Sequence, residues 1–261
     1  MKKVLNISIW ILFILGTLAL LSFAQSKKNN SVCDNWEINV DSFSGNHFVN
    51  KERVEGILKN IGLKKGEDKF ADIDAKKVEK KILALSSVQD VEVFKNIDGT
   101  LELNIAQRQP IARVFSRNGY SVYIDNKGKT MQTSEYYTAR VMTINGYVNI
   151  KSGEELALIQ GNDSLMGLTM LDELYELATY ISNDAFLKAQ IEQIYIERNK
   201  EITLIPKVGD QEIIFGKAED IKKKFDKLVL FYTKGINPNN LNLYKTINLK
   251  FDNQIVCKKN Q

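Results

Sequence analysis

Histidine and cysteine, two of the side chains that most often carry out catalysis or hold metals, are scarce in this sequence of 261 residues. Histidine occurs once, as His47, directly after Gly45 and Asn46, and this context is typical of a loop. A single imidazole supplies neither the ligands of a usual zinc site nor the partners of a histidine-based triad. We therefore expect no metal and no cofactor, and we assign His47 a surface or capping role.

Carboxylates and phosphate-binding loops are the other places where chemistry could reside. Glu154-Glu155 and Asp172-Glu173 are adjacent pairs, but glycoside hydrolysis needs two carboxylates that converge across a cleft. The sequence contains no GxxxxGK[ST] loop, GxGxxG turn or GxSxG elbow. The lysines at 222–224 indicate a solvated helix face. The sequence favours a protein that is not an enzyme and has no small-molecule substrate. A cell-wall hydrolase that uses some of its carboxylates is the weakest of the alternatives.

An uncharged segment, Val4–Ala24, opens the chain after two lysines. As a helix rising about 1.5 Å per residue it would extend roughly 31 Å, close to the thickness of a bilayer's hydrocarbon core. We predict a transmembrane helix at 4–24, with residues 1–3 in the cytoplasm. Small residues up to Ala24 leave open the alternative of a cleaved signal peptide, with Gln25 as the new N-terminus. Either way, the bulk of the chain is exported.

The exported part is almost neutral. The chain has 36 basic and 32 acidic residues, so removing Lys2 and Lys3 leaves 34 against 32, which argues against nucleic acid as a partner. Cys33 and Cys257 lie near opposite ends of this part, and an oxidising compartment would permit a disulfide. The sequence leaves open whether they pair or stay separate thiols.

A polar linker at residues 25–35 leads to a region, 36–106, with regular changes of apolar spacing. A strand pattern begins the region, and two amphipathic helix patterns follow, preceded by the caps Asn50 and Asp74. Two alternating strand patterns joined by a turn at Asp98-Gly99 complete it. The predicted order is strand, helix, helix, strand, strand.

The next region, residues 107–257, shows mostly strand alternation with hairpin turns, and two apolar helix faces at 168–181 and 221–232. We predict an α+β protein whose second domain is a β-rich mixed sheet with two helices packed on it, followed by a tail at 258–261. Its last strand is predicted from apolar residues that alternate with polar ones: Ile247, Leu249 and Phe251.

The order of elements in the first region resembles a polypeptide-transport-associated (POTRA) domain. Several phrases, in their order along the chain, resemble the FtsQ/DivIB family of division proteins: Gly45–Val49, Val88–Val93, Gly99–Leu103, Arg108–Arg113, Tyr123–Gly128 and Asn248–Val256. The resemblance implies a non-catalytic, single-pass scaffold of the divisome, with its N-terminus in the cytoplasm and its bulk in the periplasm. Such a protein sits in the inner membrane and is enriched at the division septum. A signal-cleaved periplasmic binding or chaperone protein with a POTRA-like module is the alternative.

The resemblance also implies partners and a binding site. In the family the C-terminal strand region receives FtsB, which is paired with FtsL, and the complex regulates FtsW and FtsI. Carried onto this sequence, edge-strand pairing would involve Tyr244, Leu249, Lys250, Phe251, Asn253 and Gln254. The alternative for Leu249 and Phe251 is that they face the core.

A stretch between the two regions, Arg108–Arg113, is predicted to form an inter-domain joint. Pro110 restricts the backbone, and Arg108 and Arg113 can make forked hydrogen bonds to carboxylates or carbonyls. A linker with solvated arginines is the alternative.

Overall fold

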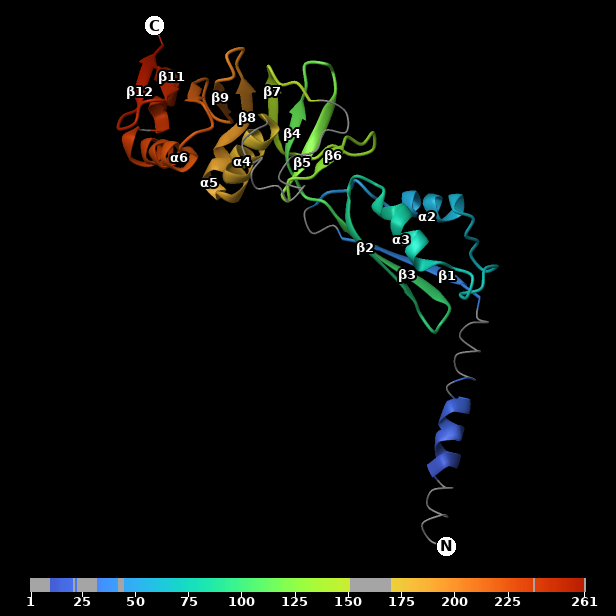
Figure 1. Ribbon diagram of the computed structural model, residues 1–261. Helices are drawn as coiled ribbons and strands as arrows, with labels where there is room; N and C mark the ends of the chain where they lie inside the picture. The colour runs from blue at the N-terminus through green and yellow to red at the C-terminus, as the bar shows by residue number, and fades with distance from the viewer. Residues whose placement is uncertain are drawn as a thin grey trace. The chain divides into compact units, whose positions relative to one another are not determined.

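The computed structural model describes residues 10–20, 22, 32–41, 45–150, 170–236 and 238–260 (Figure 1). It divides into two compact units, residues 1–107 and 108–261. Residues 10–20 are helical, and no helix within the described ranges is both long enough and apolar enough to cross a membrane. Several predictions concern residues outside these ranges: the remainder of the span at 4–9, the cleavage site after Ala24, most of the linker at 25–35, and Glu154-Glu155.

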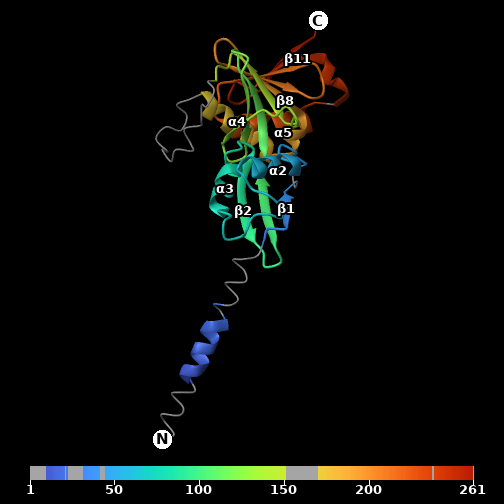
Figure 2. The same ribbon diagram turned by 90° about the vertical axis from the view of Figure 1, so that its right-hand side faces the viewer.

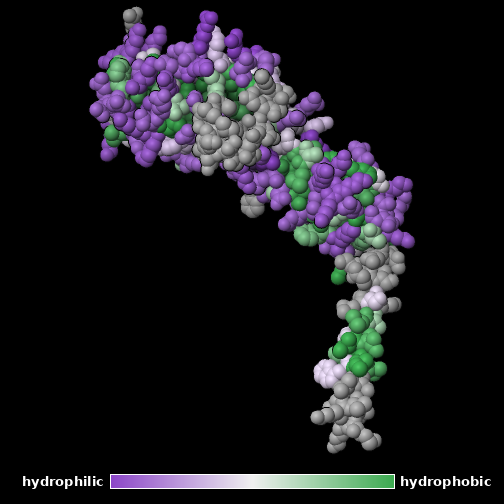
Figure 3. All heavy atoms as spheres, viewed as in Figure 1, coloured by the Kyte–Doolittle hydropathy of each residue, from purple (hydrophilic) through white to green (hydrophobic). Residues whose placement is uncertain are grey.

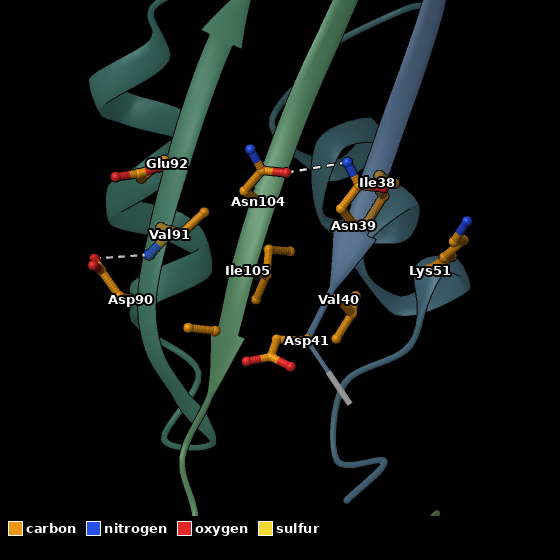
Figure 4. Close-up of a pocket in the computed structure, with 11 residues that line it drawn as sticks. Ile38, Asn39, Val40, Asp41, Lys51, Asp90, Val91, Glu92, Asn104 and Ile105 are labelled. Atoms are coloured by element: carbon orange, nitrogen blue, oxygen red, sulfur yellow. Dashed lines mark hydrogen bonds between the residues drawn. The ribbon is translucent and has the colours of Figure 1, made fainter. Parts of the chain in front are cut away.

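The first unit contains β1 (Asn35–Val40), α2 (Lys51–Asn60), α3 (Ala75–Leu83), β2 (Val88–Lys95) and β3 (Thr100–Gln107). This order confirms the predicted one. The sheet order is β1-β3-β2, with β1 parallel and β2 antiparallel to the central β3. Both helices lie behind one face of this sheet (Figure 4).

Local signals in the sequence explain both helices of the first unit. The Asn50 side chain accepts a hydrogen bond from Arg53 N at 3.0 Å, and the Asp74 side chain accepts one from Lys77 N at 3.1 Å. Each cap satisfies a main-chain donor that a helix start leaves open. The helices bury one apolar face each against the inward side of β3, with these residues: Val54, Leu58, Val78, Ile82, Leu101, Leu103 and Ile105.

The second unit is built on one nine-stranded sheet. Its strands are β4 (Pro110–Phe115), β5 (Ser121–Asp125), β6 (Thr130–Gln132), β7 (Met142–Gly146), β8 (Ile191–Ile196), β9 (Ile202–Pro206), β10 (Glu212–Gly216), β11 (Tyr244–Asn248) and β12 (Val256–Lys259). The order across the sheet is β12-β11-β10-β9-β8-β7-β4-β5-β6. The two ends of the sheet are therefore β6 and β12.

Helices gather on one side of this sheet (Figures 1 and 2). They are α4 (Met170–Asn183), α5 (Ala185–Gln190) and α6 (Ile221–Leu230), and α6 continues into a π-helical turn, η3 (Phe231–Gly235). A 3-10 segment, η4 (Pro238–Leu243), leads into β11. The apolar faces of α4 and α6 join the inward side chains of the strands in one core, shown by the stacking of Tyr180 on Phe225 at 5.2 Å.

The α+β class and the two main helices of the second unit are confirmed, and three details differ. α5 was not predicted, because six residues are too short to show helical periodicity. Residues 110–115 form a strand inside the sheet, with Ala112 and Val114 completely buried. The predicted continuation of the last strand to Phe251 is wrong, because β11 ends at Asn248, whose side chain accepts a hydrogen bond from Lys250 N at 2.9 Å and turns the chain.

Candidate partner-binding site

β12 is an edge strand that the sequence did not reveal. It pairs antiparallel with β11, in the register Asn248 with Val256 and Thr246 with Lys258, and no other strand of the described sheet lies beyond it. Asn260 N donates to Leu243 O at 2.9 Å, so the main-chain groups of Asn260, and by alternation those of Lys258 and Val256, face β11. The main-chain groups of Cys257 and Lys259 therefore face outward, where an added strand could pair with them.

The six predicted partner-binding residues lie on β11 or on the connection between β11 and β12. Leu249 is completely buried, and its N–H donates to Ile214 O at 2.9 Å, which confirms the alternative that it faces the core. Phe251 is 46% exposed, so the same alternative is wrong for that residue. Asn253 and Gln254 are exposed. The structure thus leaves Phe251, Asn253 and Gln254 accessible and removes Leu249 from the surface.

Lys227 of α6 fixes the connection between β11 and β12. Its ammonium group donates to Leu249 O at 3.1 Å and also to Phe251 O. Lys223, one turn earlier, forms an exposed ion pair with Asp252 at 3.3 Å. The helix therefore holds the connection that carries Phe251 by contacts with its main chain and with the Asp252 side chain.

Lys250 takes part in a contact inside the second unit. Its Nζ lies 2.5 Å from Glu201 Oε1, and its aliphatic chain crosses Gly216, where an added Cβ would lie 2.9 Å from Lys250 Cγ. The hydrogen bond from Lys250 lowers the pKa of the Glu201 carboxyl below its ordinary value. Lys250 thus makes contacts within its own unit, although 42% of its side chain stays accessible.

Tyr244, at the start of β11, ends a row of aromatic rings. Its ring is 6.2 Å from that of Phe231, which is 5.8 Å from Tyr232, which is 6.0 Å from Phe186. Centroid separations in this range are favourable for aromatic pairs. Burial raises the pKa of the Tyr232 hydroxyl, which accepts a hydrogen bond from Gln211 at 3.0 Å. The row ties α5, η3 and β11 together beneath the edge.

A groove of about 370 Å³ lies beside the connection. Its apolar lining comes from Leu230, Phe231 and Ile255. The remaining lining residues are Lys227, Lys234, Gly235, Asn253 and Gln254. Leu230 is 55% exposed. The coloured part of the second unit in Figure 3 is mostly hydrophilic. An open apolar groove next to an open strand edge is suited to a protein segment more than to a small polar molecule.

Comparisons with known proteins show which family the chain belongs to. Residues 109–258 match the family described as FtsQ/DivIB, C-terminal related, and residues 31–106 match a POTRA-like domain. The chain belongs to the FtsQ/DivIB family. A curated relative, the cell division protein FtsQ of Geotalea daltonii, is 24% identical over 228 residues, which cover 83% of this chain and 78% of the relative.

The predicted joint residues of this FtsQ/DivIB-family chain lie in the second unit. Arg108 donates to Asp125 Oδ2 at 2.9 Å, and that carboxylate is completely buried. Pro110 opens β4, opposite Asp125. The Arg113 guanidinium lies 4.6 Å from the Phe115 ring centre and 5.4 Å from that of Tyr123. Neither Arg108 nor Arg113 is thus a solvated linker residue, and whether the three fix a joint stays a prediction.

The first unit of this family member has a shallow groove on the sheet face that its helices leave uncovered (Figure 4). Asn39 donates to Asn104 Oδ1 at 3.1 Å across β1 and β3, and Glu92 lies on the neighbouring β2. The lining includes the charged residues Asp41, Lys51 and Asp90, with Asp90 on β2 and Lys51 on the side of β1 (Figure 4). The two edge strands of this sheet are β1 and β2, on either side of the central β3.

The other side chains considered above for catalysis or metal binding do not gather into one site in the described part of the chain. No group of three or more metal-binding side chains occurs among the residues that the structure describes. His47 is exposed, Asp172 is buried in α4 while Glu173 is exposed, and Lys224 lies over the Phe215 ring at 4.8 Å. Cys33 is buried, Cys257 is half-buried, and both are free thiols. Burial raises the pKa of each thiol.

Sequence reasoning missed β12 and the groove beside it. The only local signal was the short run Ile255-Val256-Cys257, which favours a strand, between polar residues on both sides. Four residues are too few for a reliable alternating pattern. Leu230 and Phe231 belong to the end of the predicted helix 221–232, where nothing in the sequence indicates that an apolar side chain would remain accessible.

Proposed function

We propose that this chain is a non-catalytic, membrane-anchored scaffold of the bacterial divisome that recruits FtsB, paired with FtsL, by adding a strand of FtsB to β12. Membership of the FtsQ/DivIB family and the name of the Geotalea relative support a role in cell division. The residues that would act are not catalytic groups but main-chain donors and acceptors with flanking side chains. No cofactor takes part.

The single observation that carries the proposal is the open edge of β12. The outward N–H and C=O groups of Cys257 and Lys259 can pair with an incoming strand, which would extend the nine-stranded sheet. β6, at the opposite end, has only three residues and buries Met131 completely. β12 therefore offers the better template.

Side chains around β12 indicate what kind of strand would fit. Exposed apolar residues lie at the start of β12 and on the segments before β11 and between β11 and β12: Val256 at 41%, Leu243 at 51% and Phe251 at 46% exposure. Lys258 and Lys259 are exposed on the strand itself. A partner strand with apolar side chains and acidic neighbours would complement this surface.

The anchor completes the proposed scaffold. Val4–Ala24 would hold the chain in the inner membrane with residues 1–3 in the cytoplasm, and both units would lie in the periplasm at the septum. The POTRA-like unit would contribute further contacts within the divisome. Through FtsB and FtsL the chain would link early septal assembly to peptidoglycan synthesis by FtsW and FtsI.

Replacing an outward-facing residue of β12 by proline tests the proposal. Cys257→Pro removes an N–H that β11 does not use, and the ring blocks an approaching strand, whereas Cys257→Ala keeps the donor. We expect the proline variant to bind the extracytoplasmic FtsB–FtsL pair about tenfold more weakly or worse, and the alanine variant to bind like the parent. Circular dichroism of each variant checks that the fold is intact.

Lys259→Pro repeats the test at the end of β12, where packing constraints are smaller. Lys250→Pro would not serve, because Lys250 N bonds to the Asn248 side chain and lies outside the strands. Undiminished binding by both proline variants, in folded protein, would move the interface away from β12. Failure of the parent chain to bind would exclude the assigned partner.

A further inference from the structure

The turn between β2 and β3 contains one residue that does not suit its position. Asn96 N donates to Thr100 O at 2.9 Å, Gly99 has φ of 91°, and Thr100 N donates to Asp98 Oδ1 at 2.9 Å. Asparagine, aspartate and glycine are the residues that such a turn favours. Ile97 is not, and at 86% exposure it is the most exposed large apolar side chain among the residues described.

This turn lies beside the point where the N-terminal part of the chain joins the first sheet. Asp34 N and Asn35 N both donate to Gly99 O, at 2.9 and 3.4 Å. An added Cβ at Gly99 would lie 3.3 Å from Val32 O. The turn and the start of β1 therefore form one end of the first unit. The opposite end is where Val88 pairs with Gln107, the last residue of β3.

A second loop flanks the start of β1 at the same end. Cys33 N donates to Asp68 O at 2.8 Å, and Gly66 N donates to Cys33 O at 2.8 Å. This loop carries the exposed lysines Lys64, Lys65 and Lys69. Its carboxylates make local bonds: Asp68 accepts from Lys64 N at 2.8 Å, and Glu67 pairs with Lys64 at 3.0 Å.

The distance from this end to a membrane is limited by the chain itself. Only residues 25–31 separate the predicted span from Val32, and seven extended residues reach at most about 25 Å. A tether this short makes contact with the bilayer intramolecular, so a weak interaction suffices to populate it.

We propose that the turn Asn96–Gly99 contacts the lipid bilayer, with Ile97 inserted among the headgroups and the lysines of the 64–69 loop turned to lipid phosphates. One apolar side chain and nearby lysines are the elements of interfacial membrane binding. The proposal rests on the membrane anchor of the proposed function. It gives the first unit a lipid-facing end, which the FtsB-binding edge of the second unit does not require.

A fluorescent probe at position 97 tests this contact in the full chain. Ile97→Cys is combined with Cys257→Ser and labelled with an environment-sensitive dye, while Cys33 is protected because it is completely buried. The chain is reconstituted in phosphatidylethanolamine–phosphatidylglycerol vesicles. Leu83→Cys is the matched control. Leu83 is 45% exposed at the end of α3, shortly before Val88, and so lies toward the end of the first unit opposite the turn.

We expect the emission of the probe at 97 to shift to shorter wavelength and to be quenched by lipids with spin labels near the headgroup, whereas the probe at 83 stays in water. Equal, water-like emission at both positions in vesicle-bound chain would overturn the contact and leave the anchor intact. If the chain does not stay with the vesicles, that result would instead contradict the proposed membrane anchor and the proposed localisation. Ile97→Asp, which alters only an exposed side chain, should bind FtsB–FtsL like the parent.

Discussion

Arg108 and Asp125 form a largely buried ion pair in the second unit. The Asp125 carboxylate is completely buried, and the Arg108 side chain is 18% exposed. Replacing Arg108 by alanine leaves a buried carboxylate without its cation, which typically costs roughly 3–5 kcal/mol. We expect a loss toward the lower end, because Lys127 N and Lys129 N still donate to Asp125 Oδ1. Chemical denaturation of the exported part measures the change.

The control for Arg108 is its neighbour in sequence. Gln107 is buried in the first unit, where its side chain accepts from Val49 N at 2.9 Å and donates to Asp41 O and Asn46 O at 3.0 Å. We expect Gln107→Ala to destabilise the first unit and Arg108→Ala the second, as read by tryptophan fluorescence of Trp36 and by far-ultraviolet circular dichroism. Loss of the same unit in both variants would contradict this assignment.

The carboxyl of Glu201 provides a residue-scale test by pH. The hydrogen bond from Lys250 lowers its pKa, so the contact stabilises the fold above the ordinary carboxyl pKa of about 4.3 and is lost as pH falls through the lowered value. In Lys250→Met the Glu201 carboxyl should titrate at higher pH than in the parent. Carbon-13 NMR of the side chain follows this directly. An unchanged titration would mean that the ion pair does not form in solution.

At the scale of elements, Gly146 shows how closely β7 and β8 pair. Its φ is 97°, and an added Cβ would lie 2.3 Å from Ile196 O, which is main chain and cannot move aside. We expect Gly146→Ala to separate the two parallel strands and to destabilise the second unit strongly. Gly119→Ala is the matched control, with φ of 84° and nothing within 4 Å of the added Cβ.

The control should lose only about 1–2 kcal/mol, the cost of a left-handed conformation for an L-residue. Thermal unfolding of both variants separates two costs: the left-handed backbone conformation, which both variants share, and the clash with Ile196 O, which only Gly146→Ala has. Equal losses of stability in the two variants would show that β7 and β8 move apart at Gly146 without further cost.

Which elements the sequence predicted depended on whether their signals were local. The helices of the first unit were predicted because Asn50 and Asp74 cap them and the apolar spacing is unbroken. β4 was interpreted as a joint because Pro110 begins it, Arg108 and Arg113 flank that proline, and its buried residues besides Pro110 are only the small Ala112 and Val114. In that case the neighbours β5 and β7, distant in sequence, determine the strand.

The end of β11 was missed for a related reason. Alternation continues through Leu249 and Phe251, so only the Asn248–Lys250 hydrogen bond and the Lys227 contacts stop the strand. The pairing of Lys250 with Glu201, 49 residues away, leaves no trace in local sequence. The predicted partner-binding residues thus lie on β11 and on the connection that leads into β12, but β12 itself was not predicted, and partner binding at these residues stays a prediction.

At the scale of the whole molecule, the proposed anchor predicts how the chain behaves in cells. If Val4–Ala24 spans the membrane, the protein should sediment with membranes, resist carbonate extraction and keep its N-terminal residues in the measured mass. The alternative is a periplasmic protein that has lost roughly 24 residues and is released by osmotic shock. Mass spectrometry of the protein from its own host distinguishes the two, and a shortened, soluble form would contradict the anchor.

In the proposed mechanism β12 is a free edge that becomes an internal strand when the partner binds. Hydrogen exchange of individual amides in the exported part, with and without the FtsB–FtsL pair, tests it most directly. We expect the outward amides of Cys257 and Lys259 to exchange rapidly alone and to become protected in the complex, while that of Lys258 is protected in both. Protection that appears elsewhere in a saturated complex, with Cys257 and Lys259 still exchanging rapidly, would contradict the claim.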